Sequence, residues 1–253
     1  MVAMSRLDIV SRPLYSALSN SKDCILCYIW QEDEKKTIGR YLSGEIVMNP
    51  SIRQQVMDAR GFCNLHTYQL HKAAFSGQTE DGLGLVMYMH DVLADIKSAL
   101  EAKPQRLRKR RIAAYLKDLE EPLISKGECA VCTHLLEYDK MYSQTLLKLL
   151  DSNQDFGNQF MKTKGLCIGH IRSTLNSIGS VKVKDVNRTV EVLLQPSKEF
   201  IKESSFLLSE YIRKSKWEFR GESKKKEAEA IPDAVKFLSG TIGLFYRLRL
   251  SST

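Results

Sequence analysis

The sequence predicts an all-α fold formed by tandem duplication of one helical unit. Glycine and proline together make up 20 of the 253 residues, about 8% where ~12% is usual, so few residues interrupt helices. Apolar side chains recur at helical spacing in the long segments. All six cysteines fall into two matching patterns, with 105 residues between Cys24 and Cys129 and 104 between Cys63 and Cys167. This self-similarity indicates a repeat of about 105 residues.

The first copy contains five expected helices. In a short helix before the second cysteine motif, Asn49 is the expected cap and Pro50 the first helical residue. Gly61 fits the stop of that helix. The other expected helices are residues 7–18, 28–42, 63–74 and 83–100.

The second copy repeats this order. Its short helix begins at Asn153 or Asp155 and stops at Gly165. Its other expected helices are residues 112–124, 135–150, 167–178 and 186–211. The predicted organisation is a first helical repeat at residues 1–102, a basic linker at 103–111, a second repeat at 112–212 and a basic C-terminal extension at 213–253.

Each copy carries a Cys-x2-Cys pair followed by Gly-x-Cys-x2-His, with 35 or 34 residues between the second and the third cysteine. Two such pairs supply three sulfurs and one nitrogen, which is a standard ligand set for structural zinc. We therefore expect two Zn²⁺ ions per chain, each bound within one repeat. An iron–sulfur cluster is the alternative cofactor, and buried thiols or disulfides are the alternative to a metal. The two expected ligand sets are Cys24, Cys27, Cys63 and His66, and Cys129, Cys132, Cys167 and His170.

Four protein ligands leave no open position on the ion for water or substrate, which argues against hydrolytic zinc chemistry. The sequence also contains no phosphate-binding glycine loop, dinucleotide fingerprint, Gly-x-Ser-x-Gly elbow or His-Glu-x2-His motif. We expect a non-enzymatic scaffold or interaction protein. An enzyme with a cleft between the repeats is a further hypothesis, although no catalytic residue can be named for it.

The order of these motifs resembles an uncharacterised prokaryotic family of this length, whose members carry two such half-motifs. The resemblance covers about residues 20–240 and implies the metal sites, but no activity. The residues that carry it are the Cys-x2-Cys pair, Val47-Met48-Asn49-Pro50 with Arg53, Arg60-Gly61-Phe62-Cys63 with His66, Gly82-Leu83-Gly84-Leu85, and Lys216-Trp217-Glu218-Phe219-Arg220.

The net charge of +8 is concentrated between and after the repeats. Dense basic runs favour contact with a polyanion, so RNA, a ribonucleoprotein or an acidic protein is the expected partner; a solvated linker is the plainer reading. In the extension, Trp217 and Phe219 are expected to dock on the core, with base stacking as the alternative. The residues expected to contact the polyanion are Arg106, Arg108, Lys109, Arg110 and Arg111.

The expected location is the cytoplasm. No apolar run reaches the ~18–20 residues that span a bilayer, and no signal peptide is visible. Six cysteines in such a chain are more consistent with metal ligands than with disulfides. A second functional hypothesis uses the same residues: a redox- or metal-responsive protein whose Cys3His sites release zinc on oxidation or hold an iron–sulfur cluster.

Overall fold

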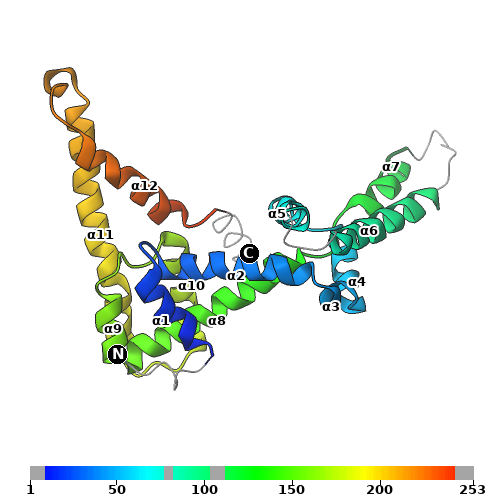
Figure 1. The fold of residues 1–253 in the computed structure, drawn as a ribbon, viewed down its shortest axis with the longest axis horizontal. Coiled ribbons are helices and arrows are strands. Elements are labelled where there is room, and N and C mark those ends of the chain that lie inside the picture. Colours follow the sequence, from blue (N-terminus) through cyan, green and yellow to red (C-terminus); the bar gives the residue numbers. More distant parts are fainter. Residues whose placement is uncertain (1–8, 77–81, 103–111, 243–253) are drawn as a thin grey trace. The chain divides into compact units, whose positions relative to one another are not determined.

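The computed structural model describes residues 9–76, 82–102 and 112–242. Within these residues the chain forms only α-helices and short 3-10 helices (Figure 1), which confirms the expected all-α class. None of the described helices is long and apolar enough to cross a bilayer. The α-helices are α1 (Ser11–Asn20), α2 (Ile25–Tyr41), α3 (Gly44–Val47), α4 (Pro50–Asp58), α5 (Asn64–Ala74), α6 (Leu83–Glu101), α7 (Ile112–Glu120), α8 (Ala130–Ser152), α9 (Gln154–Phe160), α10 (Ile168–Ser177), α11 (Val186–Lys214) and α12 (Lys225–Ser239). The 3-10 helices are η3 (Glu121–Leu123), η4 (Ile178–Ser180) and η5 (Trp217–Phe219).

The chain divides into two compact units with bounds that differ from those of the predicted repeats. The first unit is Met1–Glu32 together with Leu136–Thr253, and the second is Asp33–Leu135. The boundaries fall inside α2 and α8. Each unit therefore combines segments of both predicted repeats. The duplication itself remains a prediction from the sequence.

The core of the first unit is apolar and closely packed. Tyr15 of α1 meets Phe156 of α9 edge-on, with ring centroids 5.0 Å apart. The long helix α11 and the following α12 form a helical hairpin (Figure 1), in which Phe200 faces Phe237 at 5.1 Å. The largest fully buried side chains of this unit are Leu14, Ile25, Leu146, Leu147, Phe156, Phe160, Leu166 and Leu193.

In the second unit, α3, α4 and α5 pack on α6. The ring of Phe62 lies edge-on to Tyr41 and to Tyr88, at centroid distances of 6.0 and 5.4 Å. Arg53 of α4 pairs with Asp91 of α6 at 2.5 Å. These contacts hold the loop that leads into Cys63 against the body of the unit.

Several predicted helix ends are confirmed. The Asn49 side chain accepts hydrogen bonds from the backbone N–H groups of Ser51 and Ile52, and Pro50 is the first helical residue. In the other short helix, Asn153 rather than Asp155 is the cap, accepting from Phe156 N–H. Helices α2 and α8 begin earlier than expected, because each starts directly after the first cysteine of its motif.

Candidate metal centres

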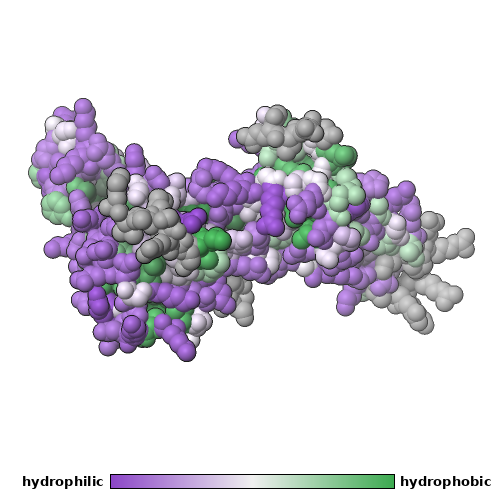
Figure 2. All heavy atoms as spheres, turned by 60° about the horizontal axis from the view of Figure 1, so that its bottom comes forward, coloured by the Kyte–Doolittle hydropathy of each residue, from purple (hydrophilic) through white to green (hydrophobic). Residues whose placement is uncertain are grey.

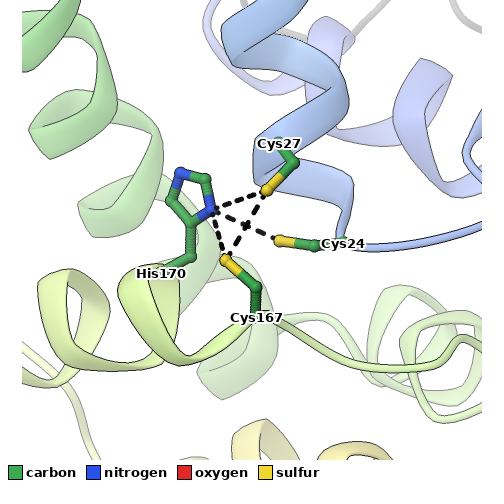
Figure 3. A group of neighbouring side chains, drawn as sticks. All are labelled: Cys24, Cys27, Cys167 and His170. Atoms are coloured by element: carbon green, nitrogen blue, oxygen red, sulfur yellow. Dashed lines mark hydrogen bonds between the residues drawn. The ribbon is translucent and has the colours of Figure 1, made fainter. Parts of the chain in front are cut away.

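The eight predicted ligand residues come together as two Cys3His groups. The first cluster is Cys24, Cys27, Cys167 and His170 (Figure 3), and the second cluster is Cys63, His66, Cys129 and Cys132. In each cluster the four donor atoms lie within 4.8 Å of one another. Each group could therefore hold a metal ion.

The expected division of these ligands between the two sites was wrong. Cys24 and Cys27 do not face Cys63 and His66 but the pair from the other half of the sequence. Closing the 140-residue loop from Cys27 to Cys167 costs only about 1 kcal/mol more than closing the ~36-residue loop to Cys63. The length of the intervening loop therefore has little effect on which ligand pairs share a site. The packing of the helices determines this pairing.

All four ligand pairs are built in the same way, at the start of a helix. The first residue of each pair precedes the helix and accepts the first helical hydrogen bond through its carbonyl, as from Tyr28 N–H to Cys24 and from Ile171 N–H to Cys167. The second residue follows three positions later, in the first turn, on the same face. Each cluster thus joins two helix N-termini, whose positive dipole ends favour thiolates.

In the first cluster the histidine nitrogen is surrounded by sulfur. His170 Nδ1 lies 3.4 Å from Cys24 Sγ, 3.4 Å from Cys27 Sγ and 3.3 Å from Cys167 Sγ (Figure 3). The sulfurs of Cys27 and Cys167 are 3.6 Å apart. Cys24, Cys167 and His170 are buried.

The second cluster has nearly the same dimensions. His66 Nδ1 lies 3.5 Å from Cys63 Sγ, 3.4 Å from Cys129 Sγ and 3.5 Å from Cys132 Sγ. The sulfurs of Cys63 and Cys132 are 3.6 Å apart. Here Cys63 and Cys132 are partly exposed, whereas His66 and Cys129 are buried.

These distances fit a single tetrahedral ion. With metal–sulfur bonds of about 2.3 Å and metal–nitrogen bonds of about 2.0 Å, tetrahedral angles place two sulfurs about 3.8 Å apart and sulfur and nitrogen about 3.5 Å apart. The measured separations of 3.6 Å and 3.3–3.5 Å are close to both values. An ion at the centre would contact all four donors with little rearrangement.

A carboxylate lies close to the second ring nitrogen, Nε2, of each cluster histidine. Glu34 Oε1 lies 3.1 Å from His66 Nε2. Asp139 Oδ1 lies 3.0 Å from His170 Nε2, which is an ion-pair distance, although the alignment falls short of a full hydrogen bond. Such a carboxylate fixes the ring orientation and raises the basicity of a ligating histidine.

The sequence reasoning missed both carboxylates, although the sequence holds a signal for them. Glu34 follows Cys27 by seven residues, and Asp139 follows Cys132 by seven. Both motifs therefore read Cys-x2-Cys-x6-acid. Each carboxylate lies on a helix that begins with the thiols of one cluster, and it contacts the histidine of the other cluster.

The thiols of the first cluster differ in their affinity for protons. Hydrogen bonds from Cys24 and Cys27 lower the pKa of the Cys167 thiol. Burial, together with a hydrogen bond to Cys167, raises the pKa of the Cys24 thiol well above its ordinary value. Protein groups alone thus favour one thiolate over its neighbours, whereas a bound cation would stabilise all three at once.

A cavity of about 370 Å³ adjoins the first cluster within the first unit. Cys27 lines it, together with a chain of ion pairs in which Lys164 contacts Asp233 at 2.7 Å and Asp23 at 3.5 Å. Lys236 contacts the other oxygen of Asp23 at 2.8 Å. The charges along this wall are therefore paired with one another.

The structure bears on the predicted contacts of the C-terminal extension but not on those of the basic linker. Arg106, Arg108, Lys109, Arg110 and Arg111 lie outside the described residues. In the extension, Trp217 is 73% exposed, so the expectation that it docks on the core was wrong. Phe219 is partly buried beneath the guanidinium of Arg213, which lies 4.6 Å from its ring centroid.

The chain was compared with known protein families, curated proteins and solved structures. The model of a protein family described as "Family of unknown function (DUF6062)" matches residues 5–243. This match confirms the expected resemblance to an uncharacterised family. No curated protein and no solved structure matches the chain.

Proposed function

The chain belongs to the DUF6062 family, and we propose that it is a zinc-stabilised, non-enzymatic helical scaffold that binds RNA or a ribonucleoprotein. Each of the two clusters would hold one Zn²⁺ ion and fix two helix N-termini together. Basic segments outside the clusters would contact the partner. The absence of disulfides among its six cysteines suits a reducing compartment, and we place the protein in the cytoplasm.

The observation that carries this proposal is the tetrahedral spacing of four protein donors in each cluster. A site closed by four protein ligands leaves no position for a substrate or a reactive water, as in structural rather than catalytic zinc. In a four-iron cluster each cysteine binds a different iron, which would hold the sulfurs farther apart than the 3.6 Å found between Cys27 and Cys167. The spacing therefore supports a single ion at each site.

The partner assignment is supported by the distribution of charge. The chain carries a net charge of +8, and its basic runs lie at residues 103–111 and beyond residue 213, away from the cysteine motifs. A polyanion that contacts Lys and Arg releases counterions, so its affinity should fall steeply with salt. Binding of a uridine oligomer should weaken at least about tenfold between 50 and 200 mM salt. Salt-insensitive binding, or none, would contradict this part of the proposal.

Metal analysis tests the central part. Protein purified without oxygen is examined by elemental mass spectrometry and by its visible spectrum. The proposal predicts two zinc ions per chain and no visible band. Iron with acid-labile sulfide, or a chain free of any transition metal, would contradict it.

One observation favours a second candidate function, a redox-responsive protein. Cys63 and Cys132 of the second cluster are partly exposed, and the cavity reaches Cys27 of the first. Oxidants of small size could therefore meet ligating sulfurs and release the ion. Mild peroxide should then release zinc within minutes, and a thiol reductant should restore binding. Full retention of zinc through this treatment would contradict the redox function.

A further inference from the structure

The end of the α11–α12 hairpin presents an exposed aromatic ring among basic side chains. We define the basic tip as residues 211–227, which comprise the end of α11, η5 and the start of α12. Trp217 is 73% exposed, and the guanidinium of Arg220 stacks 3.6 Å from its ring centroid. Most of the indole therefore still faces solvent. Figure 2 shows this end of the hairpin, at the upper left, as largely hydrophilic.

Acidic residues neutralise only part of the tip. Arg213 pairs with Glu210 at 2.9 Å and with Glu222 at 2.7 Å. Lys214 pairs with Glu227 at 2.8 Å. These pairs connect the end of α11 to the turn and to the start of α12.

The remaining basic side chains are available to a partner. Lys216, Arg220, Lys225 and Lys226 have no carboxylate within ion-pair distance among the described residues. Lys224 contacts the Ser215 hydroxyl at 3.1 Å. Positive charge thus lies on both sides of the turn that carries Trp217. The acidic residues of the basic tip are Glu218 and the paired Glu222 and Glu227.

We propose that the basic tip binds single-stranded RNA, with a base stacked on Trp217 and phosphates held by the neighbouring lysines and Arg220. Proteins that bind single strands combine stacking rings with a basic track for the backbone, and an arginine beside the ring adds a cation–π contribution. This inference rests on the proposed function, because it places the RNA contact at one site. It adds a contact that the basic linker alone would not provide.

The chemistry of the tip favours RNA over a membrane surface. A peripheral membrane contact needs a continuous apolar face beside the basic residues. Within the basic tip the exposed large apolar side chains are Trp217 and Ile212, and the ring of Phe219 is covered by Arg213. One ring surrounded by charge fits stacking better than insertion.

The two tryptophans make the test direct. Trp30 is 4% exposed and Trp217 is 73% exposed, so quenching by an added ligand reports on Trp217. A 12-residue uridine oligomer is titrated into the full chain in low salt, and intrinsic fluorescence is followed. We expect saturable quenching, which Trp217→Ala should abolish. When binding is followed instead by a fluorescent label on the RNA, Trp217→Ala should bind about tenfold more weakly than the parent chain.

Two further variants complete the design. Ile212→Ala removes a similarly exposed apolar side chain of the same tip and should leave the RNA affinity unchanged. Lys225→Ala with Lys226→Ala should lower the slope of log affinity against log salt by roughly 1. Each variant should retain the metal content and circular dichroism of the parent, because the tip contains no cluster residue.

The outcomes separate the two proposals. RNA binding that leaves the fluorescence unquenched and is insensitive to Trp217→Ala overturns the tip assignment, while the proposed scaffold function stands. No RNA binding by the parent chain overturns both the RNA partner and the tip. A blue shift of Trp217 fluorescence with anionic vesicles, in a chain that does not bind RNA, overturns the inference in favour of a membrane.

Discussion

The sulfurs of Cys27 and Cys167 lie 3.6 Å apart although 140 residues separate them in the sequence. Each belongs to a ligand pair at the start of a helix, and the two pairs come from different halves of the chain. A metal ion at this point would act as a long-range cross-link, and the second cluster would act as another. Each cluster therefore combines ligands from both halves of the sequence rather than ligands from a single repeat.

Metal removal should proceed in two steps. Cys63 and Cys132 of the second cluster are partly exposed, whereas Cys24, Cys167 and His170 of the first are buried. A strong chelator should therefore remove one zinc ion quickly and the other slowly. Zinc release can be followed with a chromogenic chelator, and the slow step should coincide with the main loss of helicity. Release of both ions in a single phase would contradict the difference in access.

The two carboxylates should each tune one site. Glu34→Gln removes the charge beside His66, and Asp139→Asn removes the charge beside His170. We expect each variant to lower zinc affinity at its own site by about tenfold and to leave the other site unchanged. Competition with a calibrated chelator measures both constants. Glu137→Gln, on the exposed side of α8, is the matched control and should change neither. Equal weakening of both sites by one carboxylate variant would refute this division.

The two equivalent glycines before the Cys-x2-His motifs should differ in their tolerance of a side chain. A Cβ at Gly165 would lie 2.7 Å from the backbone nitrogen of Ser197, and φ there is +76°. Ser197 holds this close approach through hydrogen bonds to both backbone groups of Leu166, at 3.1 and 3.2 Å. Gly61 has a φ of +101° but no atom within 4 Å of an added Cβ.

Gly165→Ala should therefore lower the free energy of unfolding by about 3 kcal/mol or more, because steric overlap adds to backbone strain. Gly61→Ala should cost about 1–2 kcal/mol from backbone strain alone. Urea unfolding of the metal-loaded proteins measures both. If both substitutions lowered the free energy of unfolding by similar amounts, the contact between residue 165 and Ser197 would not be tight.

Tyr88→Phe should stabilise the protein. The ring is 1% exposed, and its buried hydroxyl has no hydrogen-bond partner among the described residues. Removing that hydroxyl should raise the free energy of unfolding by about 1 kcal/mol at pH 7. Urea unfolding checks this value, and Tyr68→Phe, at an exposed ring, is the control that should have no effect.

The same substitution should change the response to alkaline pH. Burial raises the pKa of Tyr88 to about 12, whereas an unfolded tyrosine loses its proton near pH 10. Between these values the folded state binds more protons than the unfolded state, so stability falls as pH rises, by up to about 3 kcal/mol. Tyr88→Phe should lack this loss. If the free energy of unfolding fell equally with pH in the two proteins above pH 10, the raised pKa of Tyr88 would be contradicted.

Much of the fold could be predicted from the sequence, because its determinants are local. Helical periodicity and the scarcity of glycine and proline indicated the class. Asn49 and Pro50 identified a helix start by capping chemistry alone. The eight clustered residues were identified because cysteine and histidine in paired, repeated spacing have few structural uses other than metal binding.

The pairing of the ligands could not be predicted, because it depends on tertiary packing. Both motifs read the same, so Cys24 and Cys27 are chemically matched to either Cys-x2-His pair. The entropy of loop closure discriminates between the two choices by only about 1 kcal/mol. Glu34 and Asp139 were missed for a related reason: an acidic residue on a helix is usually a solvated surface group, and only the contact with a histidine distinguishes these two.

In the cross-paired arrangement, each Cys-x2-Cys pair shares a metal site with the Cys-x2-His pair from the other half of the sequence. Selective loss of one metal site tests this arrangement most directly. Two triple variants are compared: Cys24→Ser, Cys27→Ser, Cys167→Ser, which removes ligands of the first cluster alone, and Cys24→Ser, Cys27→Ser, Cys63→Ser, which damages both clusters. Zinc per chain is measured by elemental mass spectrometry after gel filtration. The cross-paired arrangement predicts one tightly bound zinc ion in the first variant and none in the second. One zinc ion in the second variant and none in the first would show that each site is formed within a single repeat.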